Sequence, residues 1–342
     1  FFFNSYLPLD EAIWTTEDKG FPAINSIITA AASACGQDHY LVNVQIVLAA
    51  GALFAIATYF WVRETIGERT AKTAAWIIAF HPIVIGWSTG LMRDTLVAAF
   101  GWFMVAALLR LSRLRRKSFI PVLAAFVLSA LVTWYIRNMT FAYLLGVSAL
   151  MFLLGRKSLI RKGAKVSVFA TLVASVAILL ATTDVLERFG KSWTYGERFR
   201  SDVGVDATTV NDGGISARMA QSGSTSVYLV AAPYAFIAPF PVYATPVGAS
   251  GEPGRLVDYI FNVGGLVNLF LFVLLAPALY LWYLHRRWDL LVIAGPVFWI
   301  VCVLCILGAG QSRWIMPFVY PVVAASVSYL VQNVLNRNEM AS

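Results

Sequence analysis

Long apolar windows separated by short polar loops fill most of this chain of 342 residues. A helix that crosses a bilayer needs about 20 mostly apolar residues. The pattern predicts an all-α polytopic membrane protein with about nine transmembrane helices in a single integral membrane domain over 1–342. The nine windows lie at 41–62, 72–89, 94–111, 119–136, 139–155, 166–183, 257–282, 290–309 and 314–333.

Other apolar and polar stretches differ from these windows. The stretch 226–247 holds four prolines, which remove backbone hydrogen bonds that a lipid-exposed helix requires, so it is predicted to be a broken, re-entrant or interfacial element. The stretch 21–35 is too short to span and is predicted to be interfacial. The polar segment 184–225 precedes the proline-rich stretch. We therefore expect 184–256 to form an extracytoplasmic loop, either a cover over a substrate or a solvated connector.

The opening residues, FFFNSY, resemble the end of an apolar segment. The chain also begins at Phe1 without a methionine. We therefore expect the sequence to be incomplete at its N-terminus, with further residues upstream.

Charge is scarce and unevenly distributed. Hydrophobic residues make up 59% of the chain and charged residues 13%, with a mean hydropathy of +0.72. Soluble domains carry about 25% charged residues, so this composition excludes a soluble globular protein. If 226–247 does not cross, one set of loops holds 16 of the 26 Lys and Arg residues and 4 of the 18 acids. The positive-inside rule assigns these loops to the cytoplasm, so the net charge of +8 is a topology signal and does not indicate nucleic-acid binding. The loops are 63–72, 110–118, 156–165, 285–289 and 334–342.

Several of the remaining basic residues are arginines at helix ends on the predicted outer face. Arg93 lies in the turn GLMRDT, Arg137 in the turn WYIRNMT and Arg313 at the start of the last window. An arginine at a helix end often extends to the lipid headgroups, but outer loops are ordinarily poor in arginine. Because guanidinium groups bind phosphate through two parallel hydrogen bonds, these residues predict a site for an anionic lipid or a phosphate. The long outer loop adds Arg198, Arg200 and Arg218 as candidates.

Acidic residues near the same face are candidate proton acceptors for a catalytic step. Asp94 follows Arg93 at the start of a window, and Asp10 and Glu11 lie in SYLPLDEAIW. Asp94 is also placed to act as an N-cap of its helix. Asp10 and Glu11 also suit a solvated outer face, so both interpretations stay open at this point.

Motifs for metals and nucleotides are missing from the sequence. Cys302 and Cys305 lie within an apolar window without a second cysteine pair, which favours a core position over a metal or redox site. His81 precedes Pro82 within a predicted span and is expected to bond a neighbouring helix. The sequence has no Walker A motif, dinucleotide loop or HExxH motif, so we predict no metal and no other cofactor.

Three stretches resemble bacterial polytopic proteins of surface-polysaccharide assembly. The run AKTAAWIIAFHPIVIGWSTGLMRDTLVAAFGWFMVAALLRL has their small-residue helix, proline, W-S segment and R-D turn. The later AAPYAFIAPFPVY resembles their "aPfP" element, and GQSRWIMPFVYPVV resembles their arginine-led last helix. Together these stretches cover about a third of the chain. They resemble the Wzy-type and EpsG-like polysaccharide polymerases and related membrane glycosyltransferases of the C-type fold.

This resemblance implies an enzyme that uses a polyprenyl-phosphate- or polyprenyl-pyrophosphate-linked sugar on the outer leaflet. Arg93, Asp94 and Arg313 match the motif positions, and Pro239 and Pro241 match the aPfP element. The other candidate arginines have no motif behind them. The implied location is the bacterial cytoplasmic (inner) membrane, with the active face extracytoplasmic.

The leading hypothesis is a metal-independent membrane glycosyltransferase or polysaccharide polymerase of the cell envelope. Its expected partners are an undecaprenyl- or other polyprenyl-phosphate-linked sugar, membrane lipid and other envelope-assembly proteins. Two alternatives remain: a transporter or flippase of a lipid-linked or anionic solute, and a non-catalytic subunit of a membrane complex. A transporter would be expected to carry charges in the middle of its spans, whereas the charges here lie at span ends or in loops.

Overall fold

The computed structural model describes residues 20–37, 39–89, 93–111, 119–154, 256–288, 290–291, 293–294 and 312–341. Every helix or strand assigned in these ranges is an α-helix, which confirms the all-α prediction for them. The chain divides into two compact units. The first unit is Phe1–Phe80 with Trp87–Leu172, and the second is His81–Gly86 with Val173–Ser342.

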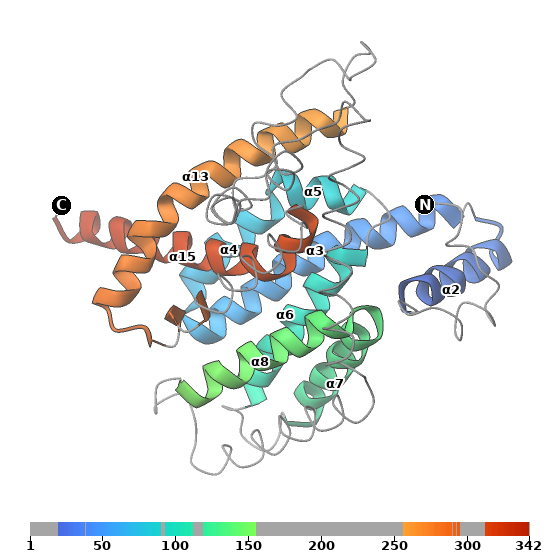
Figure 1. The fold of residues 1–342 in the computed structure, drawn as a ribbon, viewed down its shortest axis with the longest axis horizontal. Coiled ribbons are helices and arrows are strands. Elements are labelled where there is room, and N and C mark those ends of the chain that lie inside the picture. The colour runs from blue at the N-terminus through green and yellow to red at the C-terminus, as the bar shows by residue number, and fades with distance from the viewer. Residues whose placement is uncertain are drawn as a thin grey trace, which may run out of the picture. The chain divides into compact units, whose positions relative to one another are not determined.

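The first unit is organised around helix α6 (Figure 1). α6 packs against α3, α7 and α8, and α3 also packs against α2 and α4. Side chains bury 72% of the apolar window of α6 but only 22% of that of α7, so α6 is the central helix and α7 a peripheral one. The helices are α2 (Gly20–Ala34), α3 (His39–Thr65), α4 (Glu68–Ala79), α6 (Arg93–Leu111), α7 (Phe119–Ile136) and α8 (Asn138–Leu154).

Small residues allow these helices to approach closely, as is usual where lipid supplies no hydrophobic driving force between helices. A Cβ atom on Gly101 of α6 would lie 2.4 Å from Cδ1 of Leu144 of α8. An apolar cluster joins α3, α6 and α7 near the start of α6. It consists of Ala50, Leu96, Val97 and Ile136, with Phe100 and Val132 packed against it.

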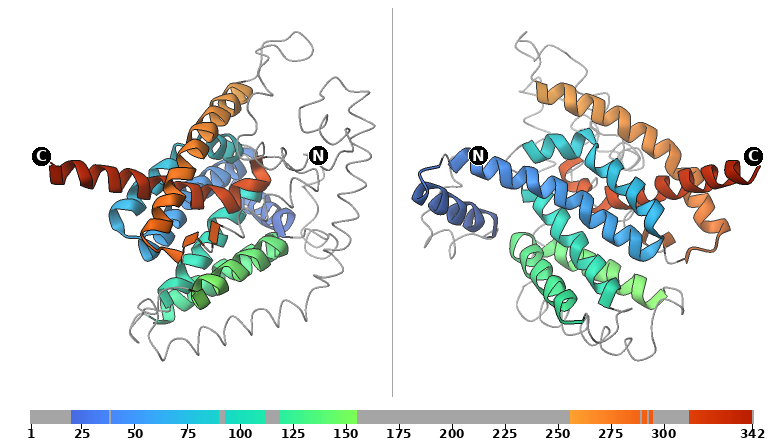
Figure 2. Two further views of the ribbon diagram at one scale, coloured as in Figure 1. Left: turned by 60° about the vertical axis from the view of Figure 1, so that its left-hand side comes forward. Right: turned by 180° about the vertical axis from the view of Figure 1, so that it is seen from behind.

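The second unit contains α13 (Leu256–Leu284) and α15 (Ser312–Ala341), which pack against each other. The two helices cross in both views of Figure 2. The first residues of α5 (Pro82–Thr89) belong to the same unit. A Cβ atom on Gly264 of α13 would lie 2.4 Å from Cγ1 of Ile83 and 3.2 Å from its backbone nitrogen, so this glycine is required for α5 and α13 to meet.

Five helices are long and apolar enough to cross a membrane among the residues that the structure describes. They correspond to the predicted windows 41–62, 94–111, 119–136, 257–282 and 314–333.

The other predicted segments have mixed outcomes. α8 covers all but the last residue of the window 139–155, and α2 covers all but the last residue of the short stretch 21–35. The window 166–183, the stretch 226–247, the loop 184–225 and most of 290–309 lie outside the described residues. The total of about nine spans therefore stays a prediction.

The window 72–89 does not form one helix. α4 ends at Ala79 and α5 begins at Pro82, so the prediction of a single regular span there is wrong. Proline disfavours the helical conformation of the residue before it but suits the first position of a new helix. His81 reinforces this break, because its Nδ1 accepts the N–H of Ile83 at 3.2 Å as a side-chain N-cap.

The prediction that His81 bonds a neighbouring helix is confirmed. Nε2 of His81 lies 2.9 Å from Oδ1 of Asn268 in α13. Because Nδ1 accepts a hydrogen bond and so carries no proton, Nε2 is the ring nitrogen that is protonated and donates. Nδ2 of Asn268 in turn donates to the hydroxyl of Tyr320 in α15 at 3.1 Å. This buried chain of polar groups fixes the start of α5 to α13 and α15.

Candidate functional site

A buried group of polar side chains marks the start of α6, at the predicted outer face. Asp94 is in the first turn of α6, and its side chain is only 6% exposed. Thr95 follows it and is fully buried. Two charged or polar residues buried at a helix end carry a desolvation cost that their partners must offset, so their contacts define the site.

Arg137 reaches this group from the break between α7 and α8. α7 ends at Ile136 and α8 begins at Asn138, so Arg137 alone separates the helices. Its backbone N–H donates to the carbonyl of Thr133 at 2.8 Å, and its carbonyl accepts from the N–H of Phe141 at 3.1 Å. Hydrogen bonds on both sides hold the Arg137 backbone in place and so fix the point from which its side chain extends.

Arg137 and Asp94 form an ion pair, in which Nη1 of Arg137 donates to Oδ1 of Asp94. The side chain of Arg137 is 19% exposed. The positive end of the α6 macrodipole favours the Asp94 carboxylate at this position. The pairing joins two candidates that are 43 residues apart in the sequence.

α3 and α5 pack closely beside Thr95, the residue that follows Asp94. A Cβ atom on Gly51 of α3 would lie 2.4 Å from Oγ and 3.1 Å from Cβ of Ser88, and 3.9 Å from Cγ2 of Thr95. Ser88 is itself buried. Glycine at position 51 therefore lets Ser88 approach α3 this closely, whereas Thr95 lies at ordinary van der Waals distance. The hydroxyl of Thr95 has no hydrogen-bond partner among the residues that the structure describes.

This arrangement can bind an oxyanion. A guanidinium carries five N–H donors on a planar fork, so one edge can hold a carboxylate while another faces a phosphate. The carboxylate of Asp94 orients the guanidinium of Arg137 and prevents it from rotating away. In the described part of the chain, no group of three or more His, Cys, Asp or Glu residues is arranged to hold a metal ion.

The other predicted site residues are only partly located by the structure. Arg93 is the first residue of α6, and Arg313 lies in the first turn of α15, in the second unit. The positions of their side chains are not described. Asp10, Glu11, Arg198, Arg200 and Arg218 lie outside the described residues.

Thr95 and Ser88 belong to the site but were not candidates from the sequence. Each lies next to a feature that the sequence did single out, since Thr95 completes the turn GLMRDT and Ser88 belongs to the W-S segment. The sequence feature that could have identified them is a hydroxyl residue within or next to a motif already singled out. That signal is weak, because Ser and Thr are also common as helix caps.

Comparison with known proteins identifies the fold. No family model matches the chain, and no curated protein matches it. A search of solved structures finds the archaeal oligosaccharyltransferase AglB from Archaeoglobus fulgidus, in complex with an inhibitory peptide and a dolichol-phosphate, at a TM-score of 0.52 and 15% sequence identity. The similarity covers 94% of this chain but only 42% of AglB. This likeness concerns the fold alone; together with the apolar helices, it indicates a helical membrane protein similar in fold to part of an oligosaccharyltransferase.

Proposed function

We propose that this protein is a membrane glycosyltransferase that takes sugar from a polyprenyl-phosphate- or polyprenyl-pyrophosphate-linked donor outside the cytoplasmic membrane. The buried Asp94–Arg137 pair at the start of α6 carries this proposal. It supplies an oriented guanidinium at the predicted depth of a lipid phosphate. The similarity of the fold to an oligosaccharyltransferase that was solved with a dolichol-phosphate supports it.

Arg137 binds a phosphate oxygen of the donor in this proposal. Arg93 begins α6 one residue before Asp94, so it adds positive charge at the same helix end. Arg313 lies in the first turn of α15 and is a further candidate for binding anionic groups of the donor. Positive charge that is already in position stabilises the negative charge that develops on a departing phosphate.

Asp94 is a positioning residue in this proposal, because its carboxylate is already engaged by Arg137. The Asp94 carboxylate holds the guanidinium of Arg137 in place, so the acceptor hydroxyl needs another proton acceptor. The proton of the acceptor hydroxyl then passes to Asp10 or Glu11, the other carboxylates predicted at this face.

The reaction is a substitution at the anomeric carbon of the donor sugar. The acceptor hydroxyl oxygen forms a bond to this carbon as the bond from carbon to the phosphate oxygen breaks. The electron pair of the broken bond leaves with the lipid phosphate or pyrophosphate, and the hydroxyl proton moves to the carboxylate. A phosphate ester is a good leaving group, so positioning and charge stabilisation account for the catalysis.

A polysaccharide polymerase of the bacterial inner membrane is the finer form of this proposal. It is supported by the order of the W-S, R-D and aPfP stretches along the chain. Such an enzyme works with other proteins of envelope assembly.

The test is sugar transfer by the purified protein in proteoliposomes that contain a lipid-linked sugar. We expect Arg137→Ala to lower the rate about 10²- to 10³-fold, as removal of a charge-stabilising donor does elsewhere. Arg137→Lys keeps the charge but loses the planar fork, and we expect only partial recovery. The matched control is Arg286→Ala, because Arg286 is an exposed arginine of a predicted inner loop. This variant should leave the rate unchanged.

Two results would refute the proposal. Full activity of Arg137→Ala would show that this guanidinium does not act on the donor. Movement of the labelled lipid-linked sugar across the vesicle without any transfer product would identify a transporter instead.

A further inference from the structure

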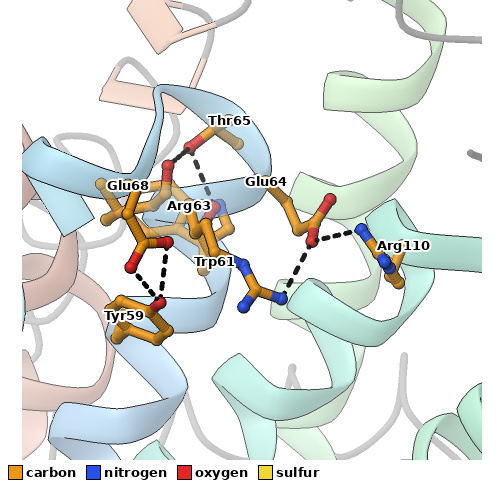
Figure 3. Close-up of polar contacts among 8 residues, drawn as sticks. Tyr59, Trp61, Arg63, Glu64, Thr65, Glu68 and Arg110 are labelled. Carbon is orange, nitrogen blue, oxygen red and sulfur yellow. Dashed lines mark hydrogen bonds and ion pairs between the residues drawn. The ribbon is translucent and has the colours of Figure 1, made fainter. Parts of the chain in front are cut away.

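A second group of charged residues crosses the opposite end of the first unit, and we call it the inner belt. It runs over α4, α3 and α6 through alternating cations and anions, of which Figure 3 shows all but Lys72. The Lys and Arg count of the loops places this end on the cytoplasmic side. The inner belt consists of Lys72, Glu68, Tyr59, Arg63, Glu64 and Arg110.

The α4 half of the inner belt is neutralised. The hydroxyl of Tyr59 lies 2.7 and 2.8 Å from the two carboxylate oxygens of Glu68, and Nζ of Lys72 lies 3.5 Å from Oε1 of Glu68. The hydrogen bond from Tyr59 lowers the pKa of the Glu68 carboxyl. One carboxylate thus balances one ammonium at this end.

The α3–α6 half carries an excess of positive charge. Oε1 of Glu64 accepts from Nη2 of Arg63 at 3.4 Å and from Nη1 of Arg110 at 3.2 Å (Figure 3). The Glu64 side chain is 5% exposed, whereas those of Arg63 and Arg110 are 33% and 48% exposed. One buried carboxylate therefore holds two guanidiniums at the surface, with a net charge of +1.

The two guanidiniums retain unused donors. Among the residues that the structure describes, Arg110 donates only to Glu64. Arg63 also lies over the rings of Tyr59 and Phe60, at 5.4 and 4.8 Å from their centroids, which restricts its orientation. Each guanidinium has five N–H groups, so both can bind a further oxyanion.

The surface beside the inner belt is suited to lipid. Trp76 of α4 and Phe80, the residue that caps the C-terminal end of α4, are stacked at 5.2 Å and are 62% and 68% exposed. They continue the face of Lys72 at the spacing of one helical turn. Exposed aromatic rings next to exposed cations are typical of the boundary between acyl chains and headgroups.

The inner belt is separate from the outer site. Asp94 and Arg110 lie 16 residues apart on α6, which at a rise of about 1.5 Å per residue places them about 24 Å apart. This is close to the thickness of the hydrocarbon core, about 30 Å. A phosphate bound at one end therefore cannot contact the side chains at the other.

We propose that Arg63 and Arg110, oriented by Glu64, bind the phosphate of an anionic phospholipid from the inner leaflet. The charge excess attracts the phosphodiester, and the two planar guanidiniums match its oxygens. Glu64 keeps the two cations side by side, which their mutual repulsion would otherwise prevent. This proposal is independent of the proposed function of the outer site.

The experiment is native mass spectrometry of the full chain released from equal mixtures of phosphatidylglycerol and phosphatidylcholine. We expect retained phosphatidylglycerol to exceed phosphatidylcholine, and Arg110→Gln to lower that preference about tenfold, the loss of a charge-assisted hydrogen bond to the phosphate. Arg286→Gln removes an exposed arginine of another predicted inner loop and should leave the preference unchanged.

Two variants distinguish a specific phosphate-binding site from general attraction of anionic lipid to a positively charged surface. Glu64→Gln raises the net charge, so surface attraction predicts stronger retention, whereas loss of the common carboxylate predicts weaker retention. Arg110→Lys keeps the charge of a half-exposed residue and so decides the matter even if Glu64→Gln does not fold. Weaker retention in Arg110→Lys supports the proposal.

Three results would overturn it. They are equal retention of the two lipids by the wild-type protein, unchanged preference in both Arg110 variants, and displacement of the lipid by millimolar glycerol phosphate. The last result would show that the guanidiniums bind a soluble phosphate and not a membrane lipid.

Discussion

Replacing Arg137 with glutamine would leave the Asp94 carboxylate buried without its cationic partner. That side chain is 6% exposed, so water cannot replace the lost guanidinium. Removing one partner of a buried ion pair costs about 3–5 kcal/mol. The attraction between the Asp94 carboxylate and the positive end of the α6 macrodipole offsets about 0.3–1 kcal/mol of this loss. We therefore expect Arg137→Gln to lower the free energy of unfolding by about 3 kcal/mol.

The double variant distinguishes the ion pair from two separate contributions. Asp94→Asn alone leaves a guanidinium that is 19% exposed, and we expect a loss near the lower end of the same range. In the double variant two neutral amides face each other and can form a hydrogen bond, so the combined loss should fall well short of the sum. The expected coupling energy is at least about 2 kcal/mol.

The measurement is equilibrium unfolding in mixed micelles, followed by tryptophan fluorescence, for the wild-type protein and the three variants. Residues that do not interact give additive losses to within about 0.5 kcal/mol. Additivity at that level would refute the assignment of a buried Asp94–Arg137 pair, and with it the reason to give Asp94 a positioning role.

Further predictions concern packing and pH. Gly51→Ala should lower the free energy of unfolding by about 1–3 kcal/mol, because its Cβ would lie 2.4 Å from Oγ of Ser88, and thermal unfolding measures this loss. Gly146→Ala, with no atom within 4 Å of the added Cβ, is its control; an equal loss there would contradict the packing argument. The hydrogen bond from Tyr59 lowers the pKa of the Glu68 carboxyl. It therefore stabilises the folded state at pH values above the ordinary carboxyl pKa, and this contribution disappears as the pH falls through the lowered pKa. Tyr59→Phe should raise the Glu68 pKa, which titration by carbon NMR detects, and an unchanged pKa would count against the contact.

Much of the helical architecture follows from the apolar windows. The window 94–111 corresponds to α6 at Arg93–Leu111, and the window 119–136 coincides with α7. This agreement has a physical cause, since a segment in lipid must satisfy its backbone hydrogen bonds internally and so remains helical over its apolar length. The break between α4 and α5 escaped the windows, because mean hydropathy does not register the backbone restriction imposed by Pro82.

The contacts of the candidate site could not be derived in the same way. The sequence places Asp94 and Arg137 at the same membrane face, since both lie at predicted outer ends of spans. Their pairing depends on how α6 and α7 rotate about their axes, and hydropathy contains no information on that rotation. The same limit applies to Glu64 and Arg110, which the sequence shows only as charges of two predicted inner loops.

The central claim is that the start of α6 binds the phosphate of a lipid-linked sugar. The most direct measurement is an experimental structure of the protein in a lipid nanodisc with a polyprenyl phosphate added. We expect phosphate density within hydrogen-bond distance of the Arg137 guanidinium, with Asp94 still paired to it. Phosphate density elsewhere on the outer face, with the Asp94–Arg137 pair unchanged and away from the lipid, would contradict it.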